Sequence, residues 1–306
     1  MRRPLRPPEF RSWSMSDGYV LRGRWWPATP PVPGVGILYL HGIQSHGGWF
    51  EGSAGRLAAA CPVLLPDRRG SGLNEPARGD TPSATRWLAD LDELATWMER
   101  EHAIHRLGVV GVSWGGKLAA LWAAGNPRRV THLLLIAPGL FPRVDIGWWA
   151  RLRVAWSLIT TPTRTFPIPL NDPALFTDNP AGRQFIAADP LKLTHATARF
   201  LWASSRLDHG LRRLPPGGLA AETTLLLAER DRIIRNAPTA AWPAARSARQ
   251  PTMVTLPAAA HTLEFETDPT AYDRLLDEWA QRLIRRDARA GATNGGCVIH
   301  PTNGCD

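Results

Sequence analysis

One pentapeptide in this chain places a serine where it could act as a covalent nucleophile. The segment GVSWG at residues 111–115 has the pattern Gly-x-Ser-x-Gly, follows an apolar run directly and precedes a stretch with helical periodicity. A serine at such a strand-to-helix turn adopts a strained backbone that exposes its hydroxyl, and the residues two before and two after it need to be glycine to avoid contact with the turn. Gly111 and Gly115 meet that need, so we predict Ser113 as a nucleophile.

A serine hydroxyl is a weak nucleophile at neutral pH, so it needs a base within hydrogen-bonding reach and an acid that orients the base. Behind a serine turn of this kind the partners follow in the order acid, then histidine. Asp231 comes just after the apolar run TTLLLA, and His261 follows the run TMVTL. Both would lie at the carboxyl ends of strands, where open α/β sheets build their sites. We therefore predict His261 as base and Asp231 as acid, with Glu229 as the alternative acid on the same loop.

Acyl transfer through a serine also needs hydrogen-bond donors for the oxyanion that develops in the transition state. One expected donor is the backbone N–H of Trp114, the residue after the serine. The other is expected from His41-Gly42-Ile43, where Gly42 permits a turn and the N–H of Ile43 can point into the site. His41 itself is expected only to brace this loop. The other histidines fit the base less well by order or context: His46, His102, His105, His132, His195, His209 and His300.

Alternating apolar runs and helical segments would position these residues. Runs without polar alternation, which suit strands covered on both faces, occur at residues 35–42, 62–70, 107–116, 131–139, 223–231 and 251–261. Helical periodicity is clearest over 87–101, and further helices are expected over 117–124 and about 271–285. Asp17-Gly18, between two short strand-like runs, predicts an opening β-hairpin. Because strand and helix alternate, we predict an α/β fold with a mostly parallel, doubly wound sheet.

The alternation breaks from about residue 140 to residue 216. This segment mixes many prolines with aromatic side chains and shows no clear strand; the aromatic residues are Trp148, Trp149, Trp156, Phe166, Phe176, Phe200 and Trp202. We predict a mostly helical cap inserted after the sixth strand. The domains are then a core in two parts (residues 1–139 and 217–286), the cap (140–216) and a flexible tail (287–306).

The charge of the chain is strongly basic. Its 36 Lys and Arg residues against 27 Asp and Glu give a formal net charge of +9, which would suit an acidic partner. Lysine occurs only at positions 117 and 192, and the arginines are scattered without a basic run, so no nucleic-acid partner is predicted. A peripheral contact with an anionic membrane surface stays open because of two clusters: Arg2, Arg3 and Arg6, and Arg282, Arg285 and Arg286.

Location and cysteine content point to an ordinary intracellular chain. The N-terminal MRRPLRPPEF is followed by no apolar signal region, and no apolar stretch reaches the ~18 residues that span a bilayer. We therefore expect a cytoplasmic protein. Cys61, Cys297 and Cys305 are too few for a disulfide framework or a structural zinc site. Cys61 is expected in the core, and whether Cys297 and Cys305 pair stays open.

At these residues the chain resembles the monoacylglycerol lipase and lysophospholipase group of α/β-hydrolases, of the serine aminopeptidase S33 type. The resemblance implies the α/β-hydrolase fold, a triad of Ser113, Asp231 and His261, an oxyanion hole from the N–H groups of Ile43 and Trp114, and a cap over the pocket. The matching segments occur in the family's order and are HGIQSHGGWF (41–50), DRRGSG (67–72), GVSWGG (111–116), ERDRII (229–234) and AAAHTLEFE (258–266).

These patterns predict a serine hydrolase that cleaves a carboxylic ester. The expected substrate is a small lipid-like acyl ester, such as a monoacylglycerol or a lysophospholipid, and no metal, organic cofactor or obligate protein partner is expected. The same triad could serve an aminopeptidase, a thioesterase or an acyltransferase. A protein of this fold that binds a ligand without turnover is a further alternative, although such proteins usually lack triad residues and none is missing here.

Overall fold

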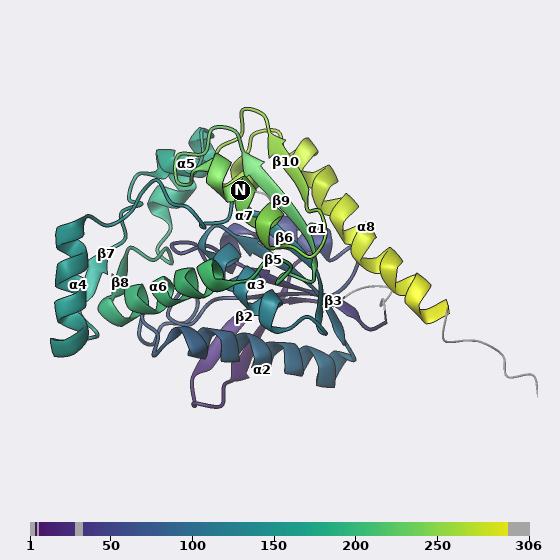
Figure 1. Ribbon diagram of the computed structural model, residues 1–306, viewed down its shortest axis with the longest axis horizontal. Helices are drawn as coiled ribbons and strands as arrows, with labels where there is room; N and C mark the ends of the chain where they lie inside the picture. The colour runs from purple at the N-terminus through teal and green to yellow at the C-terminus, as the bar shows by residue number, and fades with distance from the viewer. Residues whose placement is uncertain (1–3, 5, 28–32, 293–306) are drawn as a thin grey trace, which may run out of the picture.

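An eight-stranded sheet forms the centre of the molecule in the computed structural model, which describes residues 4, 6–27 and 33–292, with side chains as far as Arg285 (Figure 1). β2 pairs antiparallel with β1 and β4, and the other neighbours pair parallel. The predicted mostly parallel sheet is therefore confirmed. In order across the sheet, the strands are β1 (Glu9–Ser14), β2 (Val20–Trp26), β4 (Val63–Pro66), β3 (Val35–Leu40), β5 (Arg106–Val112), β6 (Val130–Ile136), β9 (Glu222–Ala228) and β10 (Thr252–Leu256).

Helices cover both faces of this sheet, as a doubly wound fold requires. They are α1 (Glu51–Leu57), α2 (Ala84–His102), α3 (Trp114–Gly125), α7 (Asn236–Arg246) and α8 (Thr270–Ala292). Two glycines of β5 face opposite sides of the sheet. A side chain at Gly108 would meet Trp279 of α8, whereas one at Gly111 would meet Ala119 of α3. α1 and α8 pack together on one face, and α2 lies beside α3 on the other (Figure 1). β3 and β4 are buried along their whole length, which explains their unbroken apolar sequences.

The first two strands form the predicted hairpin. Gly18 adopts a φ of +80° at its turn, a conformation that glycine takes without strain. The Gly18 N–H donates to the Met15 carbonyl at 2.9 Å, and the Met15 N–H donates to the Tyr19 carbonyl at 2.8 Å. The dipeptide Asp17-Gly18 therefore identifies the turn correctly.

A cap separates β6 from β9. Its helices are α4 (Trp148–Thr160), α5 (Pro180–Ala188) and α6 (Ala198–Arg213), as expected for a mostly helical segment. Although the sequence of the cap shows no clear strand, β7 (Thr165–Pro167) and β8 (His195–Thr197) pair antiparallel in a small sheet of their own. Each of these strands has three residues, too few to produce a recognisable alternation in the sequence. The predicted cap limits, 140 and 216, fall in the loops that follow β6 and precede β9.

Two buried carboxylates anchor the cap to the core. Asp189 of the cap accepts hydrogen bonds from Nε2 of His46, at 3.1 Å, and from the indole N–H of Trp49, at 2.7 Å. Asp80 of the core accepts from the Thr197 hydroxyl at 2.7 Å and forms an ion pair with Arg199 at the start of α6. Burial by itself would raise the pKa of each carboxyl, but these partners hold the pKa of both below its usual range. Both anchors are therefore ionised at neutral pH.

Some predictions concern the ends of the chain or single residues. Cys61 is buried, as predicted, and burial raises the pKa of its thiol to about 12. α8 continues past the predicted core boundary at 286 as far as Ala292, so the first residues of the predicted flexible tail are helical. The first four of them, DARA, contain no Gly or Pro. No described helix is long and apolar enough to cross a membrane, and the cytoplasmic location stays a prediction. Outside the described residues lie Arg2, Arg3, Cys297, Cys305 and His300.

Candidate active site

Ser113 lies at the turn between β5 and α3 with a strained backbone. Its φ is +52° and its ψ is −123°, values that a residue with a side chain rarely adopts. The surrounding glycines make this turn sterically feasible, because a methyl group on Gly111 would lie 2.6 Å from the Ala119 side chain and one on Gly115 would lie 2.4 Å from the His41 carbonyl oxygen. The Ser113 carbonyl accepts hydrogen bonds from the next loop and the first turn of α3, which holds the turn in place.

The structure brings His261 and Asp231 to this serine. Nε2 of His261 lies 2.9 Å from Oγ of Ser113, and Nδ1 of His261 lies 2.7 Å from Oδ2 of Asp231. An ionised carboxylate can only accept, so Nδ1 carries a hydrogen and, in the neutral ring, Nε2 is free to accept the serine proton. The other oxygen of Asp231, Oδ1, accepts from the N–H groups of Ile233 and Ile234 at 2.8 and 2.9 Å. His261 and Asp231 are both buried, which shields their hydrogen bond from water.

Glu229, the alternative acid, has a different position. It is exposed, and its Oε2 accepts a hydrogen bond from the Ala258 N–H at 2.7 Å. Glu229 therefore links the two loops that carry Asp231 and His261 without contacting the imidazole. Of the two candidate acids, the geometry brings only Asp231 to His261.

The two residues predicted to supply the oxyanion donors, Ile43 and Trp114, lie in the same cavity as Ser113. Trp114 is the first residue of α3, so its N–H has no partner within the helix. Gly42 lies against the serine on the other side, since a methyl group there would be 3.4 Å from Cβ of Ser113. Ile43, the next residue, lines the same cavity as Ser113. Ile43 and Trp114 therefore both line the cavity that contains Ser113, and the role of their N–H groups as oxyanion donors stays a prediction.

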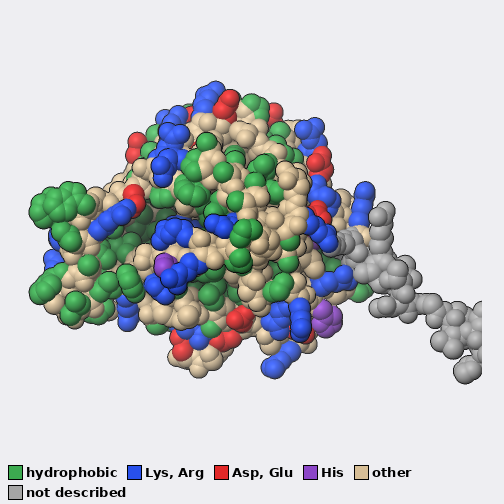
Figure 2. Space-filling model, in the orientation of Figure 1, with side chains coloured by type: hydrophobic (Ala, Val, Ile, Leu, Met, Phe, Trp, Pro, Cys, Tyr) green, Lys and Arg blue, Asp and Glu red, His purple; other side chains and the backbone are tan. Residues whose placement is uncertain are grey.

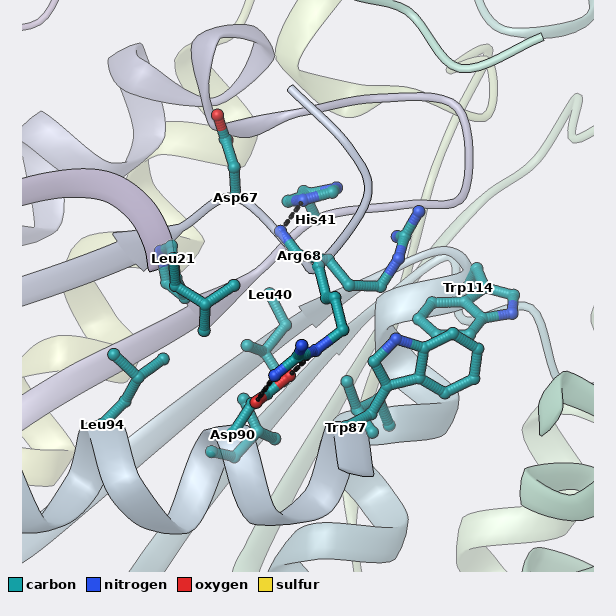
Figure 3. A pocket seen from close by; sticks show the side chains of 13 residues that line it. Leu21, Leu40, His41, Asp67, Arg68, Trp87, Asp90, Leu94 and Trp114 are labelled. Atoms are coloured by element: carbon teal, nitrogen blue, oxygen red, sulfur yellow. Dashed lines mark hydrogen bonds and ion pairs between the residues drawn. The ribbon is translucent and has the colours of Figure 1, made fainter. Parts of the chain in front are cut away.

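His41 braces this loop, as predicted. Its Nδ1 donates to the Gly42 carbonyl at 2.9 Å, and its Nε2 accepts from the Arg68 N–H at 2.8 Å (Figure 3). Burial, together with the nearby Arg68 guanidinium, lowers the pKa of His41 well below its usual value, so the ring stays neutral. Both of its nitrogens are occupied, and His41 therefore has no free nitrogen with which to act as a base.

Arg68 is a site residue that sequence reasoning did not single out. Its guanidinium donates to the carbonyls of Gly42 and Ile43 at 2.9 and 3.0 Å, and it lies over the ring of Trp114 at 4.7 Å. Burial lowers the pKa of Arg68 to about 9, which leaves it protonated at neutral pH. Arg68 thus holds the backbone of Gly42 and Ile43, and its side chain lies beside Trp114 (Figure 3). The segment DRRGSG pointed to this loop, but not to the contacts of its first arginine.

The loop that carries Asp231 is joined to the start of the cap. Residues 141–143, which we name the cap stem, pair antiparallel with residues 233–235. The Arg143 N–H donates to the Ile233 carbonyl at 2.8 Å, and Nε of Arg143 donates to the following carbonyl at 2.9 Å. The same backbone segment supplies the two N–H groups that hold Asp231. The cap stem and the acid therefore share one stretch of backbone.

A cavity of about 680 Å³ lies between cap and core and contains Ser113 in its wall. Hydrophobic side chains lie inside the hollow, and Lys and Arg side chains stand at its edge (Figure 2). Of the aromatic residues that the sequence singled out in the cap, Trp202 lines the cavity. Phe176 packs edge-on against the His261 ring. The cavity is therefore a mixed site, with apolar walls and charged groups at defined places.

The remaining histidines of the described chain have other surroundings. His46 pairs with Asp189, His102 stacks on Trp25, and His132 lies beside Glu222. Within the described residues, no group of three or more His, Cys, Asp or Glu side chains is arranged to hold a metal ion. Of the histidines in the described chain, His261 is the one that contacts Ser113.

The parallel sheet, the strained serine turn and the inserted cap together define an α/β-hydrolase. The profile of the family described as serine aminopeptidase, S33, matches residues 33–268. This match covers most of the chain, and the protein therefore belongs to that family.

Solved structures share the whole fold. A monoacylglycerol lipase of Paleococcus ferrophilus is 18% identical, with a TM-score of 0.74 over 87% of this chain and 98% of the lipase. A soluble variant of monoglyceride lipase from Saccharomyces cerevisiae, in complex with a substrate analog, is 16% identical, with a TM-score of 0.77 over 90% of this chain and 97% of that one. At such identities the likeness shows a common fold.

A curated relative matches only part of the chain. The uncharacterized protein YnbC of Escherichia coli is 27% identical over 158 residues, which are 48% of this chain and 27% of YnbC. The chain thus spans about a quarter of the length of this relative.

Proposed function

We propose that this protein is a carboxylic ester hydrolase that acts on lipid-like acyl esters through Ser113, His261 and Asp231. The observation that carries the proposal is the continuous pair of hydrogen bonds, 2.9 Å from Ser113 to His261 and 2.7 Å from His261 to Asp231. Membership of a serine hydrolase family and a fold shared with two monoacylglycerol lipases support an acyl ester as the bond that is cleaved.

In the acylation half of the reaction, Oγ of Ser113 bonds to the acyl carbon while Nε2 of His261 takes its proton. Asp231 stabilises the imidazolium that forms. The negative charge moves to the carbonyl oxygen, where the N–H groups of Ile43 and Trp114 would donate to it. His261 then gives its proton to the alcohol oxygen, the bond between acyl carbon and alcohol breaks, and the acyl group stays on Ser113.

Deacylation repeats these steps with water as the nucleophile. His261 takes a proton from water as the water oxygen bonds to the acyl carbon, and it then returns that proton to Oγ of Ser113 as the carboxylic acid leaves. The imidazole of His261 takes part in every proton transfer of the proposed reaction, which therefore needs no second acid or base from the protein.

The cavity supports an acyl chain of medium length. Its volume of about 680 Å³ and its apolar walls suit an alkyl chain, and each buried methylene contributes ~0.8 kcal/mol where it is fully desolvated. We expect the cap to exclude the greater bulk of a triacylglycerol. Monoacylglycerols and lysophospholipids are therefore the proposed substrate class.

The other reactions of this fold have less support here. An aminopeptidase needs a free carboxylate to hold the substrate ammonium, but both aspartates that line the cavity are already paired, Asp145 with Arg151 and Asp208 with Lys117. A binding protein without turnover has no need of the hydrogen-bonded pair of His261 and Asp231. Thioesterase and acyltransferase activity use the same acyl-enzyme and differ only in leaving group or acceptor.

Two measurements test the proposal. A fluorophosphonate probe should label the wild-type protein at Ser113, and p-nitrophenyl or monoglyceryl esters of medium chains should be preferred over acetate. Ser113→Ala should lose labelling and at least ~10⁵-fold of kcat, since loss of a triad nucleophile typically costs ~10⁶-fold. A labelled protein whose preference peaks at acetate would remove the lipid-like part of the proposal, and a protein that is neither labelled nor active would remove the whole of it.

Contact of the cap with a lipid surface is a second part of this proposal. One face of α4 carries large apolar side chains that are each more than half exposed, Trp148, Trp149, Leu152, Trp156 and Ile159 (Figure 2). Tryptophans on an amphipathic helix suit the headgroup region of a membrane. The predicted basic clusters offer weaker support, because Arg282 is engaged with Glu222 and Thr224. Co-sedimentation with anionic vesicles should fall at least fivefold in a Trp149→Glu, Trp156→Glu variant, and undiminished binding would exclude α4 as the contact.

A further inference from the structure

The side chains that line the cavity change from apolar to basic along its length. Positions along helix α6 show where this change lies relative to Ser113. α3 and α6 lie side by side and run in the same direction, because the Trp114 indole donates to the Ser204 hydroxyl at 2.9 Å and Lys117 pairs with Asp208 at 2.7 Å. Ser113 directly precedes Trp114. Ser204 therefore marks the level of the nucleophile on α6, and positions before and after it lie on opposite sides of the reacting bond.

On the side that precedes Ser204, the cavity wall is apolar. Leu201 of α6 and Val154 and Leu158 of α4 line this part. The charged side chains beside it, Asp145 and Arg151, form an ion pair with each other and leave no net charge. We name this part the apolar arm, and its lining suits the acyl chain.

On the side that follows Ser204, the lining is basic. Asp208 is neutralised by Lys117, but Arg212, one helical turn further along α6, lines the cavity without a carboxylate partner among the described residues. Arg235, which caps α7 just after the Asp231 loop, lines the same cavity and likewise has no carboxylate partner among the described residues. We name this part the basic arm. It carries two uncompensated positive charges, whereas every other charged side chain in the cavity wall is paired.

Further positive charges lie around the end of α6, outside the cavity wall. His209, the residue after Asp208 on α6, is half-buried. The positive charge of Arg213 lowers the pKa of His209 most, and Arg206 and Arg212 lower it further. No anion of the described chain lies close enough to Arg212 and Arg235 to form an ion pair. Guanidinium groups at the edge of a concave, partly apolar site attract an anionic ligand and bind carboxylate or phosphate oxygens in a bidentate manner.

We propose that Arg212 and Arg235 form a subsite for an anionic group on the alcohol part of the ester, so that the preferred substrates are acyl esters of alcohols that carry a phosphate or carboxylate. The inference rests on the proposed ester hydrolase activity. Arg212 lies eight residues beyond Ser204, which is roughly 12 Å of helical rise. The anion is therefore several bonds away from the scissile carbonyl, and the two arginines select the substrate without touching the reacting atoms.

The test compares two esters that differ only by a phosphate, 1-decanoylglycerol and 1-decanoylglycerol 3-phosphate, each below its critical micelle concentration. The quantity measured is the ratio of kcat/KM for the phosphorylated ester to that for the neutral ester. The wild-type ratio should exceed one and should fall as salt is added. In the double variant Arg212→Gln, Arg235→Gln this ratio should fall at least tenfold and lose its salt dependence. Arg206→Gln removes a charge from the same helix outside the cavity wall and should change the ratio less than twofold.

A second pair of esters separates the two sides of the bond. Monomethyl azelate carries its anion on the acyl part, and methyl nonanoate is its neutral counterpart. If the double variant lowers the preference for azelate and not for the glycerol phosphate ester, the basic arm faces the acyl side and the proposal is overturned. An unchanged ratio in a variant that still labels with fluorophosphonate would also overturn it. Loss of labelling and of all ester hydrolysis in the wild type would instead reject the proposed ester hydrolase itself.

Discussion

Replacement of Asp231 by asparagine tests the assignment of the acid most directly, because the surrounding backbone dictates how the new amide must be oriented. Oδ1 of Asp231 accepts from the N–H groups of Ile233 and Ile234, so the amide oxygen of the asparagine will occupy that position. The amide nitrogen must then face Nδ1 of His261, at the place now held by Oδ2 at 2.7 Å. It donates a hydrogen to Nδ1 and forces the ring hydrogen onto Nε2, where it blocks acceptance of the proton from Ser113.

The expected loss is large because the wrong tautomer and the missing negative charge act together. In the serine protease triad the equivalent change lowers kcat by ~10⁴, and we expect a loss of the same order here, which corresponds to ~5.5 kcal/mol of transition-state stabilisation. Initial rates with a p-nitrophenyl ester of medium chain length measure it, with circular dichroism as the check on folding. Fluorophosphonate labelling of Ser113 should slow in parallel.

Glu229→Gln is the matched control, since it makes the same chemical change two residues away on the same loop. Glu229 contacts the Ala258 N–H and not the imidazole, so kcat should change less than about threefold. A folded Asp231→Asn protein that keeps more than a tenth of wild-type kcat, or a Glu229→Gln protein that loses more than the Asp231 variant, would contradict this assignment of the acid.

Three further changes test the framework around the triad. Arg68→Met removes two hydrogen bonds to the oxyanion loop, and kcat should fall ~10–100-fold in steady-state assays while the melting temperature shifts little. The double variant Asp80→Asn, Asp189→Asn should lower the free energy of unfolding by ~2–5 kcal/mol at neutral pH. Because the folded-state pKa of both carboxyls is depressed, this difference from wild type is present above about pH 4 and disappears as the pH falls through the folded-state pKa values. Thermal melts at a series of pH values measure it. Gly115→Ala should unfold or inactivate the protein, because its methyl group would lie 2.4 Å from a backbone oxygen, whereas Gly125→Ala on the same helix meets nothing within 4 Å and should be neutral or stabilising in the same melts.

Much of the core follows from local sequence because most of its parallel strands are buried; the edge strand β10 is the exception. Buried strands need continuous apolar runs, and each run identified in the sequence became a strand of the sheet. The serine turn was recognisable for the same reason, since Gly111 and Gly115 are required by contacts with neighbouring backbone and side chains. The position of His261 followed from a general property of these sheets, in which the carboxyl ends of strands meet along one edge.

Other features depend on packing between distant segments and leave no local signal. Arg68 and Arg69 are adjacent arginines in one motif, yet the first binds the oxyanion loop and the second binds Asp90 of α2. The choice between Asp231 and Glu229 depends on which way their loop folds, because both residues follow the same strand. β7 and β8 pair across a long stretch of cap, and neither strand is long enough to show a period.

The shared backbone of the cap stem and the Asp231 loop has a consequence for engineering and for divergence within the family. Because the cap lines the cavity, exchanging it for another cap is a route to new specificity. Here, a foreign cap would have to reproduce the pairing of residues 141–143 with residues 233–235, or it would displace the two N–H groups that hold Asp231. Grafts that begin after Arg143 should keep the kcat of the parent enzyme. Grafts that begin at the end of β6 should change the substrate selectivity but lower kcat.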